Sequence, residues 1–119
     1  MKLQTAVLTL SLLALPVSAV VACDAPETPS VPDGAGATMD DMIATQSAIK
    51  MFQAANAEYL TCVDEQMGAE QNLVDEGDDG AQERYALAAA DYNAAVSREE
   101  QVAADFNTAI RDFKAANPD

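Results

Sequence analysis

The sequence predicts an all-α protein, an antiparallel two-helix hairpin with an extended proline-rich N-terminal strap and a coiled-coil-like seam between the helices. Three observations support this prediction. Prolines concentrate in residues 23–37, where they disfavour a helix or a central strand. Apolar residues recur at helical spacing between Met42 and Met67. From Tyr85 onward, large residues recur every seven positions.

Residues 1–22 are predicted to be a signal peptide that export removes. Lys2 gives a positive start, residues 3–15 form an apolar stretch too short for a stable membrane span, and small residues surround Ala19. Cleavage is expected after Ala19 or after Ala22. We therefore expect the mature protein to be periplasmic or secreted.

Residues 23–37, "CDAPETPSVPDGAGA", are predicted to form the strap. Pro26, Pro29 and Pro32 stand three residues apart, a spacing that suits an extended polyproline-like conformation. The "PDG" sequence that follows is typical of a turn.

The first helix is expected to span about residues 38–70 of a hairpin domain that covers 38–119. Thr38 is predicted to cap it, with Asp41 at the third helical position. Its end stays open between Met67 and Val74, because Gly68 could cap the helix or lie inside it at a cost of about 1 kcal/mol. One face carries the apolar residues Met42, Ile49, Phe52, Tyr59, Leu60, Val63 and Met67.

The second helix is expected to span about residues 80–116, after a break at "DEGDDG", with Asp79 as its N-cap. The residues spaced seven apart are Tyr85, Tyr92, Glu99, Phe106 and Phe113, and small residues lie between them. The four aromatic residues are interpreted first as core. They become a possible interaction seam, for a second copy or a partner helix, if the strap leaves them exposed.

A turn centred near residue 74 would set the register of the hairpin. It predicts the pairs Val63 with Tyr85, Asn56 with Tyr92, Ile49 with Glu99 and Met42 with Phe106. Lys50 would then lie close to Glu99, the one charged residue among the seven-spaced positions.

The two cysteines, Cys23 and Cys62, leave three interpretations open. A cysteine pair in an exported protein favours a disulfide. A strap that turns back along the hairpin can span the distance, since its residues reach about 50 Å and the helix to Cys62 rises about 35 Å. Alternatively, "VVAC" resembles a lipobox, Cys23 would carry a diacylglycerol anchor and Cys62 would be a free thiol. In the third interpretation both thiols are free.

No catalytic, cofactor-binding or metal-binding residue is predicted, and we do not expect an enzyme. The chain has no histidine, which excludes His-based triads and the Glu-x-x-His motif of di-iron bundles. The acidic turn fails the EF-hand pattern, because Gly77 and Ala86 fall where that loop needs ligands.

The charge balance restricts the classes of partner. Twenty acidic residues against six basic ones give a net charge of −14 and a pI near 4.1. Such a surface disfavours nucleic acid and anionic lipid, and it suits a cationic protein partner or simple solubility. We expect a structural or protein-binding component, with a homodimeric four-helix bundle as one arrangement. The alternative is a lipid-anchored envelope protein.

Three segments carry a resemblance to a known family: "CDAPETPSVPDGAGAT", "MIATQSAIKMFQAANAEYLTC" and "YNAAVSREEQVAADFNTAIRDFKAANP". Together they resemble a family of small uncharacterised exported proteins of Gram-negative bacteria. The resemblance implies a disulfide between Cys23 and Cys62 and a periplasmic setting. It brings no activity.

Overall fold

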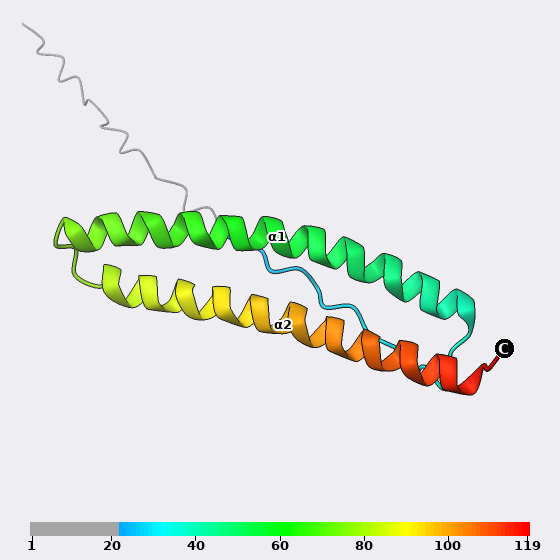
Figure 1. Ribbon diagram of the computed structural model, residues 1–119. Helices are drawn as coiled ribbons and strands as arrows, with labels where there is room; N and C mark the ends of the chain where they lie inside the picture. The colour runs from blue at the N-terminus through cyan, green and yellow to red at the C-terminus, as the bar shows by residue number, and fades with distance from the viewer. Residues whose placement is uncertain (1–21) are drawn as a thin grey trace, which may run out of the picture.

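The computed structural model describes residues 22–119, which form two long antiparallel helices and an extended N-terminal segment (Figure 1). Helix α1 spans Met39–Asp75 and helix α2 spans Ala81–Ala116, and residues 22–119 contain no strand. The predicted all-α hairpin is confirmed. The predicted signal peptide lies outside the described residues except for Ala22.

Helix α1 begins where the capping pattern predicts. The Thr38 backbone N–H donates to Asp41 Oδ2 at 2.8 Å, and the Asp41 N–H donates to Thr38 Oγ1 at 3.1 Å. This reciprocal capping box satisfies two N–H groups that the first helical turn leaves free. Hydrogen bonds from Thr38 lower the pKa of the Asp41 carboxyl below its ordinary value. The bond from the Thr38 backbone has the larger effect, and the bond from the Thr38 side chain the smaller one.

Helix α1 continues through Gly68 and ends at Asp75, so the predicted end near residue 70 was too early. The helix stops in a Schellman motif, in which the Asp78 N–H donates to the Leu73 carbonyl and the Gly77 N–H donates to the Val74 carbonyl. Gly77 has a φ of 84°, a left-handed conformation that favours glycine.

The N-cap of helix α2 lies one residue later than predicted. Gly80, with a φ of 96°, is the N-cap and makes no side-chain capping bond, so the prediction of Asp79 in that role was wrong. The left-handed backbone at Gly80 prevents the helix from starting earlier. At the other end, the Asn117 side chain donates to the Phe113 carbonyl at 2.9 Å and closes α2.

The predicted register was wrong by three to seven residues at Asn56. Asn56 lies against Ala95 and Glu99, and Glu70 bonds Arg84, whereas the prediction placed Asn56 beside Tyr92. Of the other predicted pairs, Met42 and Phe106 still lie together, because both line one cleft at the end of the hairpin. The physical reason for the shift at Asn56 is the longer α1, which moves the turn from residue 74 to residues 76–80.

Small residues occupy the centre of the seam between the helices. The buried positions of α2 stand seven apart: Ala81, Ala88, Ala95, Val102 and Ala109. The buried positions of α1 are Met42, Thr45, Ile49, Phe52, Asn56 and Val63. Alanines along one helix let the backbones approach while the larger side chains of the other fill the gap. The predicted heptad pattern is thus present, but its most buried column is the alanine column rather than the aromatic one.

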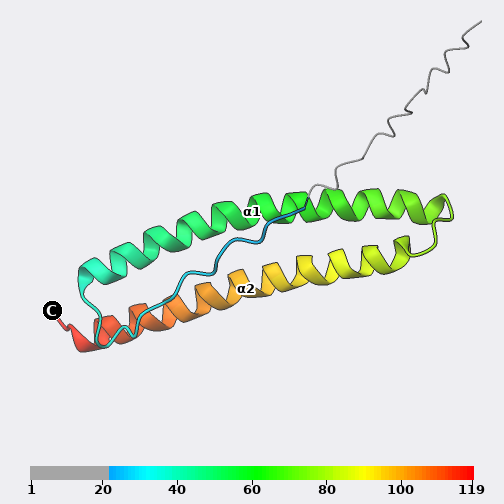
Figure 2. The ribbon, with the colours of Figure 1, turned by 180° about the vertical axis from the view of Figure 1, so that it is seen from behind.

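The strap runs back from the start of α1 along the hairpin and ends beside the middle of α1 (Figures 1 and 2). Val31 packs against the core cluster of Ile49, Phe52 and Val102. Gly34 lies so close to α2 that a Cβ there would overlap the carbonyl oxygen of Ala109. The strap is therefore packed on the helices along its length, as the cysteine spacing had suggested.

Candidate functional site

The disulfide between Cys23 and Cys62 ties the far end of the strap to α1. The two Cα atoms are 5.7 Å apart, and both residues are half-buried. With Val31 and Gly34 seated on the helices, the bond fixes the strap at its remote end. Of the three interpretations of the cysteines, the structure shows the disulfide.

The strap lies over one side of the seam and leaves a shallow groove on each side of itself. Both grooves include Thr28, Pro29 and Ser30. The α2 side chains beside the strap are Arg98, Gln101, Val102, Asp105, Thr108, Ala109 and Asp112. Since residues three and four apart share one face of a helix, these residues mark the strap side of α2.

The other side of α2 carries a row of half-buried side chains that we call the open face. Its apolar members are Tyr85, Ala89, Tyr92, Val96, Ala103, Phe106, Ile110 and Phe113. The strap-side groove includes none of them. The four aromatic residues of the predicted interaction seam thus lie together on this face, partly covered by α1 and partly open.

A buried polar contact interrupts the apolar seam at its middle. Asn56 is 0% exposed, and its side-chain amide donates to Glu99 Oε2 at 2.7 Å and to the Ala95 carbonyl at 3.3 Å. Its Oδ1 is also buried and accepts no hydrogen bond from residues 22–119. The sequence had placed Asn56 beside Tyr92 and had not predicted its bond to Glu99. The signal available was a polar residue on the apolar stripe of the first helix.

The acidic turn is held by a single arginine. Arg84 donates to Glu70 Oε2 at 2.9 Å and to Asp78 Oδ1 at 3.0 Å, so it connects the two helices and the turn. Both side-chain bonds raise the pKa of Arg84, the bond to Asp78 more than the bond to Glu70. Among residues 22–119, no three His, Cys, Asp or Glu side chains gather as a metal site would require.

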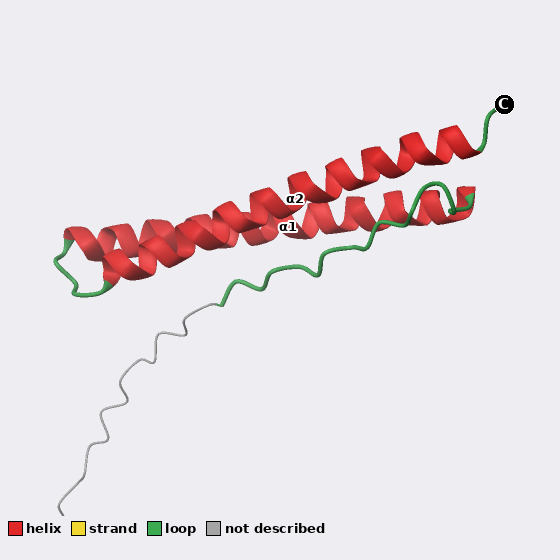
Figure 3. Ribbon diagram, turned by 90° about the horizontal axis from the view of Figure 1, so that it is seen from below, coloured by secondary structure: helices red, strands yellow, loops and turns green. Residues whose placement is uncertain are grey.

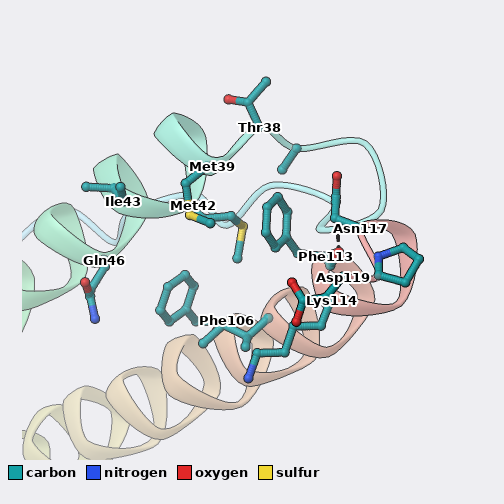
Figure 4. Close-up of a pocket in the computed structure, with 13 residues that line it drawn as sticks. Thr38, Met39, Met42, Ile43, Gln46, Phe106, Phe113, Lys114, Asn117 and Asp119 are labelled. Atoms are coloured by element: carbon teal, nitrogen blue, oxygen red, sulfur yellow. Dashed lines mark hydrogen bonds between the residues drawn. The ribbon is translucent and has the colours of Figure 1, made fainter.

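A cleft opens between the helices at the end of the hairpin remote from the turn (Figure 4). Its volume is about 1160 Å³, and its large apolar lining residues are Met39, Met42, Ile43, Phe106, Ile110 and Phe113. Phe106, Ile110 and Phe113 also belong to the open face, so the cleft is the end of that face. The sequence had placed Met42 and the two phenylalanines on apolar helix faces, but it had not predicted that they meet Met39 and Ile43 in a cleft.

Comparison with known proteins finds no family model, curated protein or solved structure that matches this chain. The resemblance to small exported proteins of Gram-negative bacteria stays a prediction. In the described part of the chain, neither helix combines the length and apolarity needed to cross a bilayer.

Proposed function

We propose that this protein is a non-catalytic, exported helical protein of the periplasm that binds another protein through the open face of α2. The observation that supports the proposal is the asymmetry of the hairpin. The strap lies along one side of the seam, whereas aromatic and aliphatic side chains on the other side are only partly buried. A row of partly exposed apolar side chains on an acidic protein is a feature of interaction sites.

The disulfide and the N-terminal sequence support export. Disulfides persist in oxidising compartments such as the periplasm and are rare in the cytosol. The bond uses the sulfur of Cys23, which is the atom that a lipobox cysteine would give to a diacylglycerol. The proposal therefore places a soluble domain, rather than a lipid-anchored one, in the periplasm.

The intact mass of the exported protein tests this part of the proposal. We expect a chain that begins after Ala19 or Ala22, with cysteines that become alkylated only after reduction. A mature chain that begins at Cys23 and is heavier by a diacylglycerol would establish the lipoprotein alternative. Two thiols that alkylate without reduction would contradict the disulfide.

Site-specific photocrosslinking in the periplasm tests binding. A photoreactive phenylalanine analogue replaces Tyr92 on the open face, and the matched control carries it at Gln101, which lies on the strap side. We expect a discrete adduct from position 92 and none from position 101. The partner identified in the adduct is then purified and its affinity measured directly.

Two other results would revise the proposal. Adducts of equal yield from both positions would show that the open face is not selective. An adduct between two copies of the chain would make the face a homodimer seam, and the protein a self-assembling structural component.

A further inference from the structure

We infer that the cleft at the open end of the hairpin binds an amphipathic helix whose polar face is cationic. The inference rests on the proposed function and names its binding site and the chemistry of its partner. It is argued from the lining of the cleft, from its shape and from the charge around it.

The lining is apolar on both walls. Met39, Met42 and Ile43 contribute from the first turns of α1, and Phe106, Ile110 and Phe113 contribute from the last turns of α2. Met42 points from α1 towards the two phenylalanine rings (Figure 4). Met39 and Ile43 are 58% and 54% exposed, so a partner can still remove much of their apolar surface from water. Methionine and phenylalanine adapt well to varied apolar partners.

The shape of the site favours a helix as its occupant. The two helices run side by side as a pair and cross at a shallow angle (Figure 3), so the groove between them accepts a third helix in the way that bundles pack. Ile43 follows Met39 by four residues, and Phe113 follows Phe106 by seven. Each interval places the two side chains on one face of their own helix, so each wall of the groove presents an apolar face to a docked helix. At the end of the hairpin, Ala37 and Thr38 close one side of the cleft.

The charge around the cleft selects a cationic polar face. The lining itself holds one basic residue, Lys114, and one acidic residue, Asp119. The charge of the surrounding residues therefore determines which partner is attracted. Asp40 and Asp41 lie in the first turn of α1, and the whole chain has a net charge of −14. Such a field attracts a basic helix and repels a second copy of this protein.

Binding of designed peptides tests the inference. The probe is a peptide of about 18 residues, five helical turns, with leucines on one face and lysines on the other. One matched peptide carries glutamates in place of the lysines, and another has the same composition in scrambled order. Fluorescence anisotropy at about 150 mM salt limits long-range charge effects.

Two double variants of the full chain locate the site. M39Q/I43Q removes the exposed apolar side chains of the cleft. M51Q/L87Q removes two that are 74% and 61% exposed and lie elsewhere. We expect M39Q/I43Q to weaken binding of the lysine peptide at least tenfold, about 1.4 kcal/mol, while M51Q/L87Q stays within twofold of the original chain. All four positions are exposed, so neither variant should disturb the fold.

Several results would overturn the inference. Equal binding of the scrambled peptide, or equal loss in both double variants, would reduce the interaction to non-specific charge attraction. Stronger binding of the glutamate peptide would show that the cleft prefers a helix with an anionic polar face. A dimer in sedimentation equilibrium that M39Q/I43Q dissociates would assign the cleft to a second copy. If the peptide fails while position 92 still yields its periplasmic adduct, the proposed function stands and only the cleft assignment fails.

Discussion

Asn56 in α1 donates a 2.7 Å hydrogen bond to Oε2 of Glu99 in α2, across the centre of the seam. The same amide reaches the Ala95 carbonyl at 3.3 Å, and Asn56 is completely buried. A single polar residue in a helical seam costs stability but restricts the register, because any slip leaves the amide buried without partners. The pair therefore gives the long alanine seam, which could otherwise slide, one preferred alignment.

Replacing Asn56 with leucine should show whether Asn56 restricts the alignment of the helices or adds to the free energy of unfolding. We expect N56L to melt at the same temperature or higher, because the buried Oδ1 without a partner disappears. We also expect several registers or oligomers, seen as multiple amide resonances and a broadened sedimentation boundary. The control is T45V, since the Thr45 hydroxyl donates within its own helix to the Asp41 carbonyl at 2.8 Å. A uniquely folded but less stable N56L would show that the amide contributes stability instead.

Removal of the disulfide should release the strap. The bond joins residues 39 apart in sequence, and closing a loop of that size contributes about 4 kcal/mol in the chain-entropy model. A C23S/C62S variant should therefore unfold at much lower urea concentration. Hydrogen exchange at Gly36, whose N–H donates to the Asp33 carbonyl at 3.2 Å, should also become fast relative to exchange in the helices. An unchanged urea midpoint would mean that the strap adds nothing to the hairpin.

Gly34 should be intolerant of any side chain. A Cβ at this position overlaps the Ala109 carbonyl oxygen, so G34A forces the strap away from α2 and should destabilise the protein by about 1–3 kcal/mol. The matched control is G36A, because a Cβ at Gly36 meets no atom within 4 Å. Urea denaturation measures both. Equal stability of the two variants would contradict the close packing of the strap.

The start of α1 should weaken in acid. The lowered pKa of Asp41 means that its stabilising effect is complete above its unfolded pKa of about 3.9. The effect is lost as the pH falls through the lower folded value. D41N should therefore show a smaller loss of stability than the original chain between about pH 4 and pH 2. D40N is the control, since Asp40 lies in the same turn outside the capping box. Identical acid profiles for the original chain and D41N would refute the prediction.

Gly68 should be replaceable with a gain in stability. It lies inside α1, and a Cβ there meets no atom within 4 Å. G68A should stabilise the protein by about 1 kcal/mol, the difference between alanine and glycine in a helix interior. G77A is the contrasting variant, because the left-handed φ of Gly77 strains any other residue. A destabilised G68A would indicate that α1 is broken at that position.

Local patterns predicted the elements better than the alignment between them. The Thr38 and Asp41 capping pair marked the start of α1 because a capping box is a short-range hydrogen-bond pattern. The end of α1 was missed because a glycine can either continue or cap a helix, and the difference of about 1 kcal/mol depends on packing elsewhere. A turn displaced by a few residues then changed the partners of Asn56.

The sequence by itself determined the all-α class, the proline-rich segment that cannot be helical and the seven-residue repeat of α2. Each follows from backbone sterics or helical periodicity over neighbouring residues. Only the tertiary structure decided that alanines rather than aromatics form the centre of the seam and that Asn56 meets Glu99. It also decided that Met39 and Ile43 share a cleft with Phe113. These contacts join residues far apart in the chain, and their register depends on where the turn falls, which no local pattern specifies.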